Sequence, residues 1–364
     1  MGSRAMAGLI GIILALAAGA WSSACGSRTG LELSAATASD IGTGSGSGGG
    51  TGTGSGSGTG TGNGSGTATD AGVTPRAVLF GGTNIPATVW LDLSDTWTFD
   101  GIGWHQPDVS GAGPSGREDA AMAALGAELV LFGGSTQADA TQVLADTWVW
   151  RGGVWTQLDI PGPRGRTAAV MAPLGGKLVL FGGSTGSGGT VSLSDTWTFD
   201  GSAWSQVNVL MAPARSNAVM APLQDKLVLF GGVEQGVGYH ADTWTFDGTI
   251  WTQLGVAGPS KRAYAVLAPL AEKLVLFGGT DFNSVFADTW TWDGTAWAQV
   301  SDAGPSGRSA ATAAPLTGSV VLFGGTSGET GAQLSDTWTW DGTSWTQINV
   351  SGPSGRASAM MGAL

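Results

Sequence analysis

Apolar and polar positions follow one pattern that recurs six times between about residue 74 and residue 364. Each copy begins with a short apolar run ending in Phe-Gly-Gly, passes through a loop of variable length, and resumes at an Asp-Thr-Trp segment. A tight turn, a further Trp and a Pro-x-x-Arg or Pro-x-Arg stretch close the copy. The phenylalanines of the apolar runs are Phe80, Phe132, Phe181, Phe230, Phe277 and Phe323, with separations of 52, 49, 49, 47 and 46 residues. A period near fifty with several short strands per copy is typical of a propeller blade.

The third copy shows the four strands that each unit is expected to contain. A small, plain first strand covers residues 166–171, and the second, 178–181, is apolar on both faces, as in a strand covered on both sides. The third covers 195–199, where side chains alternate between the two faces. Asp200-Gly201 is a strong hairpin signal, and Trp204 begins the fourth strand. Six such units predict an all-β, six-bladed β-propeller with four antiparallel strands per blade.

The two ends of the repeat region predict how the ring closes. The first copy starts at Ala77 with no complete first strand before it, whereas the last copy continues into residues 356–361, a first strand with no second. We therefore expect the C-terminal strand to complete blade one, which removes two free strand edges. The alternative is a truncated chain that lacks a seventh blade.

These repeats resemble the kelch family of galactose-oxidase-type propellers over about residues 74–364. The resemblance rests on two spaced aromatics, such as Trp244 and Trp251, and on paired glycines after each apolar strand. The first glycines of these pairs are Gly81, Gly133, Gly182, Gly231, Gly278 and Gly324. The family usually has Tyr where this chain has Phe or Trp near the end of the third strand. The resemblance implies closure by a terminal strand, and it places the loops after Gly-Gly and the starts of the first strands on one face. It does not decide function, because propellers host many activities.

The N-terminus is expected to be a targeting segment, so we divide the chain into a signal peptide (1–24), an anchor and linker (25–72) and a propeller (73–364). Arg4 precedes an apolar run, and the small residues before Cys25 resemble a bacterial lipoprotein cleavage site. Cys25 is then the lipidation site and attaches the protein to a membrane. Ser22 stands where Leu is usual, and ordinary cleavage after Ala24 is the alternative. Either route predicts export to the cell envelope, anchored at the outer membrane or extracellular.

Residues 42–66 contain only Gly, Ser, Thr and Asn. Such a segment cannot bury enough apolar surface to fold, and as a flexible coil it would span roughly 25–30 Å. We expect a tether that holds the propeller just off a membrane; the alternative is a low-complexity insertion without a role.

Composition excludes several function classes. The net charge of −12 argues against a nucleic-acid partner. Galactose oxidase chemistry needs copper held by histidines and tyrosines with a crosslinked cysteine, and this propeller has no cysteine, two histidines and two tyrosines. The spacing Asp-Gly-x-x-Trp does not match the box of sialidases. No phosphate loop, nucleophile–base pair or metal-ligand spacing is present, so we expect no cofactor and no metal. We also expect a monomer.

Aligning the six copies with one another separates scaffold from specificity. An arginine, an alanine three residues later and the third-strand aspartate recur in every copy. We interpret the arginines as Arg–Asp or Arg–backbone contacts that tie blades together; the alternative is an arginine ring at the channel mouth that attracts carboxylates. The position two residues after each arginine varies and is expected to line an asymmetric pocket. It is occupied by Asp119, Ala168, Asn217, Tyr264, Ala310 and Ser358.

The loops after Gly-Gly vary in length and carry aromatic residues, and function tends to lie on such loops. The ligand-binding candidates are Trp90, Tyr239, His240, Phe282, Phe286, Arg117, Asp119, Arg262 and Tyr264. They favour a noncatalytic scaffold that presents a loop-rich face to a protein or glycan. The alternatives are a carbohydrate-active enzyme of epimerase or lyase type, in which Tyr264, Glu118 or Asp119 acts as acid or base, and a structural envelope protein.

Overall fold

The computed structural model describes residues 76–364 except 86–89, 110, 137–142, 186–190, 209–211 and 301–302. The expected signal peptide, Cys25 and the Gly-rich linker lie outside the described residues. Within the described part there is no helix long and apolar enough to cross a membrane.

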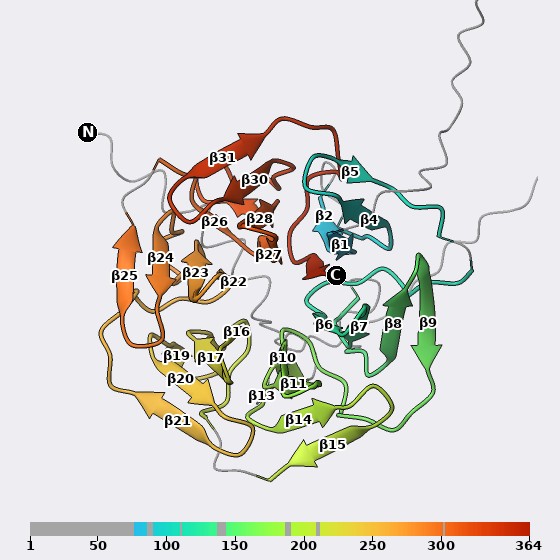
Figure 1. The fold of residues 1–364 in the computed structure, drawn as a ribbon, viewed down its shortest axis with the longest axis horizontal. Coiled ribbons are helices and arrows are strands. Elements are labelled where there is room, and N and C mark those ends of the chain that lie inside the picture. The colour runs from blue at the N-terminus through green and yellow to red at the C-terminus, as the bar shows by residue number, and fades with distance from the viewer. Residues whose placement is uncertain are drawn as a thin grey trace, which may run out of the picture. The chain divides into compact units, whose positions relative to one another are not determined.

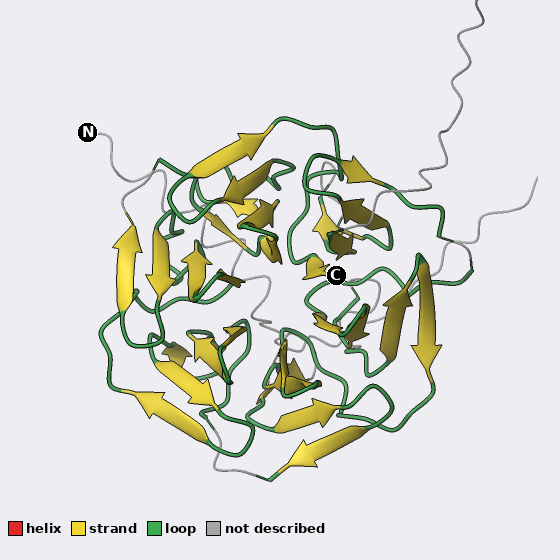
Figure 2. Cartoon of the chain, viewed as in Figure 1, coloured by secondary structure: helices red, strands yellow, loops and turns green. Residues whose placement is uncertain are grey.

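Six four-stranded antiparallel sheets surround a central axis (Figures 1 and 2). Each sheet is one blade, with its first strand innermost. Blade one consists of β32 (Met360–Ala363), β1 (Ala77–Phe80), β4 (Thr96–Phe99) and β5 (Trp104–His105), and blade two of β6 (Ala121–Leu125), β7 (Glu128–Phe132), β8 (Thr147–Arg151) and β9 (Val154–Leu158). Blade three consists of β10 (Val170–Leu174), β11 (Lys177–Phe181), β14 (Thr196–Phe199) and β15 (Trp204–Val207), and blade four of β16 (Val219–Leu223), β17 (Lys226–Phe230), β20 (Thr243–Phe246) and β21 (Trp251–Leu254). Blade five consists of β22 (Val266–Leu270), β23 (Lys273–Phe277), β24 (Thr289–Trp292) and β25 (Trp297–Val300), and blade six of β27 (Thr312–Leu316), β28 (Ser319–Phe323), β30 (Thr337–Trp340) and β31 (Trp345–Ile348).

Short two-stranded sheets lie at the loop ends of the blades. They pair β2 (Thr83–Asn84) with β3 (Leu91–Asp92), β12 (Ser184–Thr185) with β13 (Val191–Ser192), β18 (Val233–Glu234) with β19 (Gly238–Tyr239), and β26 (Arg308–Ser309) with β29 (Thr326–Ser327). They stiffen the loops that follow the Gly-Gly pairs.

The predicted closure is confirmed. β32 pairs antiparallel with β1, from Phe80 opposite Met360 to Ala77 opposite Ala363, and Figure 1 shows the red C-terminal strand beside the blue β1. β32 also lies between β27 and β6, the first strands of the neighbouring blades. The ring therefore closes with six blades, not seven.

The first strands begin later than predicted. In blade three we expected 166–171, whereas β10 covers Val170–Leu174. Ala168 adopts a positive φ of 55°, which turns the chain before the strand can start. The second, third and fourth strands begin within one residue of their predicted starts.

The blades pack face to face through their apolar second strands. Leu178–Phe181 is buried throughout, and residues such as Phe181 and Leu229 from adjacent blades share one hydrophobic cluster. The tryptophan at the first or second position of each fourth strand reaches the preceding blade: the Trp251 indole donates a 3.0 Å hydrogen bond to Thr196 Oγ1 and packs on Phe181, with ring centroids 4.8 Å apart. The same indole–threonine bond recurs in every blade, including Trp104 to Thr337 across the closure. These contacts explain the abundance of tryptophan as blade-to-blade packing.

Candidate functional site

The face that carries the loops after Gly-Gly also carries the starts of the first strands. In blade two, Ala121 at the start of β6 pairs with Phe132 at the end of β7, which in turn pairs with Thr147 at the start of β8. We call this the loop face. Its central part is the mouth of the axial channel.

Six backbone units form a closed ring at this mouth. Each of the six variable residues has a φ between 52° and 58°, the left-handed region that non-glycine residues seldom adopt. The Ala168 N–H donates to the Asp119 carbonyl at 2.8 Å, and the Asp119 N–H donates to the Ser358 carbonyl at 3.1 Å. Four equivalent bonds, at 2.9–3.0 Å, complete the cycle through Asn217, Tyr264 and Ala310. Because every blade contributes one residue, the ring fixes six side chains around the axis.

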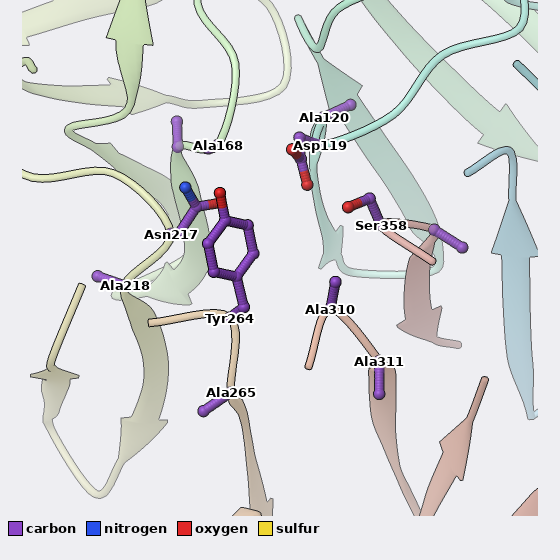
Figure 3. A pocket seen from close by; sticks show the side chains of 12 residues that line it. Asp119, Ala120, Ala168, Asn217, Ala218, Tyr264, Ala265, Ala310, Ala311 and Ser358 are labelled. Atoms are coloured by element: carbon purple, nitrogen blue, oxygen red, sulfur yellow. The ribbon is translucent and has the colours of Figure 1, made fainter. Parts of the chain in front are cut away.

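The ring encloses a cavity of about 130 Å³. The walls are the six variable residues and the six recurrent alanines, so the prediction of an asymmetric lining is confirmed for these positions. The Tyr264 ring extends from blade five toward Asn217, whereas Asp119 and Ser358 lie together on the other side (Figure 3). The alanines also bound a second cavity of about 190 Å³ further along the axis, lined by the first strands.

Burial controls the electrostatics of this cavity. Removal from water raises the pKa of Asp119 to about 6, although a hydrogen bond from Ser358 acts in the opposite direction. Burial also raises the pKa of Tyr264, and the negative charges of Asp119 and Glu118 and the neighbouring Tyr239 raise it further. Tyr264 is thus a neutral hydrogen-bonding group, and Asp119 is a carboxylate poised to change charge in mildly acidic solution.

The candidate arginines lie in the scaffold. Arg117 is 1% exposed; its guanidinium contacts both Asp146 carboxylate oxygens, at 2.7 and 2.9 Å, and the Gly133 carbonyl at 3.0 Å. Arg262 makes the same contacts with Asp288 and the Gly278 carbonyl. Burial alone would raise the pKa of Asp146, but the hydrogen bonds and charge of Arg117 outweigh it and lower that pKa.

These ion pairs support the structural interpretation of the arginines. Each side-chain pair joins the start of the first strand to the third strand of the same blade and so stiffens that blade. The backbone of each arginine ties it to the preceding blade: the Arg117 N–H donates to the Leu93 carbonyl at 3.3 Å, and the Arg117 carbonyl accepts from the Gly82 N–H at 2.9 Å. In blade one the pair is Arg356 with Asp95, which fastens the C-terminal segment to the N-terminal one. The geometry does not support an arginine ring that faces a ligand.

Two of the loop candidates are exposed. Trp90 in blade one is 45% exposed and Phe282 in blade five is 55% exposed, both on the loop face. Phe282 has a φ of 81° and lies at the tip of a turn in which the Asp281 carboxylate accepts hydrogen bonds from the Asn283 and Ser284 N–H groups. A bulky residue held in this backbone conformation costs about 1–3 kcal/mol, a strain that is often retained where the side chain has a role.

His240 and Phe286 occupy a position whose backbone contact recurs in every blade. In each case the backbone N–H donates to the carbonyl of the second glycine of the Gly-Gly pair: His240 to Gly232 and Phe286 to Gly279. Leu144 makes the same bond to Gly134 in blade two. His240 lies 3.5 Å from a Glu234 carboxylate oxygen, and its pKa is lowered by burial and by Arg215. Phe286 lies 4.0 Å beneath the Arg262 guanidinium. His240 and Phe286 both stand two residues before the third-strand aspartate. The other four blades have Leu at this position, which indicates that its side chain packs against the blade.

Tyr239 is half-buried on β19, and burial and the charge of Asp281 raise its pKa. Asp119 and Tyr239 both raise the pKa of Tyr264, so these three side chains lie close enough to influence one another electrostatically. Trp90 and Phe282 lie on loops of the same face. No group of three or more His, Cys, Asp or Glu side chains that could hold a metal is present among the described residues.

The comparisons with known proteins agree with the fold. Residues 150–295, from the end of β8 to just beyond β24, match the family described as the KLHDC2/KLHL20/DRC7 Kelch-repeats domain. No curated protein matches the chain. The match supports the kelch resemblance of a six-bladed propeller and is consistent with a protein-binding scaffold in general terms.

Proposed function

We propose that this kelch-like propeller is a noncatalytic scaffold that binds a protein through its loop face. The observation that carries the proposal is the exposure of Trp90 and Phe282, the two exposed Trp or Phe side chains among the described residues, on that face alone. The opposite face exposes aliphatic side chains at its turns, such as Ile102 and Ile250. Aromatic anchors on a rigid support are typical of binding surfaces.

The size of the axial cavity favours binding over sugar chemistry. Pockets that enclose a small-molecule substrate usually measure about 300–1,000 Å³, whereas the cavity at the mouth measures about 130 Å³. Asp119 and Tyr264 supply the acid–base groups that an epimerase or lyase would need, but a sugar ring would have little space between them. A glycan is the alternative ligand and would lie across the loops, outside this cavity.

We further propose that the protein is exported and anchored through a lipid at Cys25, with residues 42–66 as a tether. The support comes from the sequence alone: one cysteine, placed after small residues at the end of an apolar run. Cys25→Ser should release the protein from the membrane fraction and leave the melting temperature of the propeller unchanged. Equal membrane partition of both forms would contradict the anchor.

The binding proposal is tested by capture from a cell-envelope extract and, in parallel, on a glycan array. The full chain is compared with Trp90→Ala and Phe282→Ala, and with Ile102→Ala and Ile250→Ala as controls on the opposite face. Loss of an aromatic anchor should weaken binding by about 2 kcal/mol or more, roughly thirtyfold. If only the control variants weaken binding of a ligand, the site lies on the face opposite the loop face. If the full chain captures no protein and no glycan, the structural role is favoured.

A further inference from the structure

One charged side chain lines the axial cavity without a cation beside it. Asp119 is the only ionisable carboxylate among the lining residues, which otherwise comprise Tyr264, Asn217, Ser358 and alanines. The recurrent arginines are buried in pairs with aspartates of their own blades. The Asp119 carboxylate therefore faces the cavity and is stabilised there by a hydrogen bond from Ser358. A half-buried carboxylate without a cation beside it is stabilised more by a cationic ligand than by a neutral or an anionic one.

The rest of the lining suits one kind of cation. Blades two and five are opposite each other in a ring of six, so Asp119 and Tyr264 belong to opposite sides of the axis, with Asn217 beside Tyr264 and Ser358 beside Asp119 (Figure 3). An ammonium group offers three hydrogen-bond donors and no acceptor, which matches the carboxylate, hydroxyl and amide oxygens of Asp119, Ser358, Tyr264 and Asn217. The Tyr264 ring adds a face for a cation–π contact. The methyl groups of the alanines provide walls for an unbranched alkyl stem.

We propose that the channel mouth binds a primary ammonium group carried on an unbranched alkyl chain. Two sources share this chemistry: a lysine side chain of a bound protein and a free alkylamine. The inference deepens the proposed function and rests on it for the first source only, because the cavity would accept a free amine without any contact to the loops.

The acidic groups around the channel mouth also favour a cation there. Glu118 and Tyr239 both raise the pKa of Tyr264, and Asp281 raises that of Tyr239. The polar side chains that share the cavity with Asp119 are those of Tyr264, Ser358 and Asn217. Binding of the ammonium group requires ionised Asp119, so affinity should be full well above pH 6 and fall as the pH drops through that value.

The ring itself supplies the matched variants. Asn217 occupies the equivalent place in blade four with a φ of 53°, and Ala168 and Ala310 occupy it with 55° and 54°. Asp119→Asn and Asp119→Ala are therefore compatible with the backbone, and Asn tolerates this conformation well. Asp225→Asn, in an exposed turn on the opposite face, is the control for a change of net charge.

The test uses n-butylammonium as the probe and n-butanol as its uncharged counterpart, titrated into the full chain by calorimetry at pH 7.5 and pH 5. We expect n-butylammonium to bind and n-butanol to bind at least tenfold more weakly. Asp119→Asn should weaken n-butylammonium at least tenfold, Tyr264→Phe less, and Asp225→Asn not at all. Equal binding of amine and alcohol, or unchanged amine binding in Asp119→Asn, would overturn the proposal.

Two further arms identify the source and separate this proposal from the proposed function. A short peptide with one lysine is compared with the same peptide carrying Nε-acetyl-lysine: preference for the free lysine assigns the site to a protein, and binding of n-butylammonium alone assigns it to a soluble amine. Trp90→Ala and Phe282→Ala should leave n-butylammonium unaffected. If they also leave protein capture unaffected while Asp119→Asn abolishes amine binding, the loop-face proposal fails and the ammonium site stands.

Discussion

Removal of residues 355–364 should unfold the whole propeller. The deletion takes away β32, the innermost strand of blade one, and leaves β1 with an unpaired edge although all four of its residues are buried. It also removes Arg356, whose guanidinium bonds to both Asp95 carboxylate oxygens and to the Gly81 carbonyl. Finally it breaks the backbone ring at Ser358. A change at the last ten residues is thus a change to the closure of the entire domain.

The expected cost can be worked out from these contacts. Met360 and Met361 are 4% and 7% exposed, and burial of each contributes about 1.5–3 kcal/mol. The backbone hydrogen bonds of the β1–β32 ladder contribute about 1 kcal/mol each, and leaving Asp95 without its partner costs a further 1–3 kcal/mol or so. The four residue pairs of this ladder carry about four such bonds, so the sum is roughly 8–13 kcal/mol, comparable to the whole stability of a typical domain, about 5–15 kcal/mol.

Thermal melting followed by circular dichroism measures this effect. The truncated chain should lose its cooperative transition, and addition of a synthetic peptide of residues 355–364 should restore part of it. Deletion of Leu364 alone removes one backbone hydrogen bond, to the Arg76 carbonyl at 3.1 Å, and an exposed side chain, and should cost only about 1 kcal/mol. A truncated protein that melts cooperatively at the unchanged temperature would refute closure by β32 as the basis of stability.

Three other outcomes are expected. Burial raises the folded-state pKa of Asp119 to about 6, so the ionised group costs stability at neutral pH, and Asp119→Asn should raise the melting temperature at pH 7.5 by an amount equivalent to roughly 1–3 kcal/mol. The gain should shrink as the pH falls through 6 and vanish below about pH 4, where the carboxyl group of the wild type is protonated in the folded and the unfolded state. Trp251→Phe removes the hydrogen bond to buried Thr196 and should lower the free energy of unfolding, measured by chemical denaturation, by about 1–3 kcal/mol. The double variant Trp251→Phe/Thr196→Val should lose less stability than the sum of the two single variants, because both remove the same bond. Strictly additive losses would argue against the bond. Phe282→Gly relieves a positive φ and should leave the melting temperature unchanged or slightly higher, and a clear loss of stability would show that the ring of Phe282 packs on the fold.

The fold could be predicted from the sequence because repetition carries it. The period, the apolar second strands and the unmatched first strand at the C-terminus predicted six blades and their closure, and β1 was predicted residue for residue. The late start of β10 could not be predicted, since Ala168 gives no sign in the sequence of its left-handed backbone. That conformation is imposed by the ring around the axis, a tertiary contact.

The site was predictable only in part. Variation among aligned repeats identified Asp119 and Tyr264 as cavity residues, because lining side chains are free to differ where the scaffold is not. The burial of Arg117 could not be read from one sequence, although its strict recurrence favoured a structural role. Aligning the loops two residues before each third-strand aspartate would have shown that His240 and Phe286 occupy a position that the other four blades fill with leucine and that bonds to the second glycine of the pair.

The pairing of β1 with β32 also sets a timetable for the making of this protein. Met360 follows Phe80 by 280 residues, so at ordinary rates of synthesis, about 5–20 residues per second, β1 waits roughly 15–60 s for its partner. Blades two to six can each assemble from consecutive strands as they emerge, whereas Ala77–Phe80 remains an apolar segment without its inner neighbour. A chain whose synthesis stops early never obtains that partner, and its first strand stays open to chaperones and proteases. Closure from the last strand therefore acts as a check that translation has reached the end of the propeller.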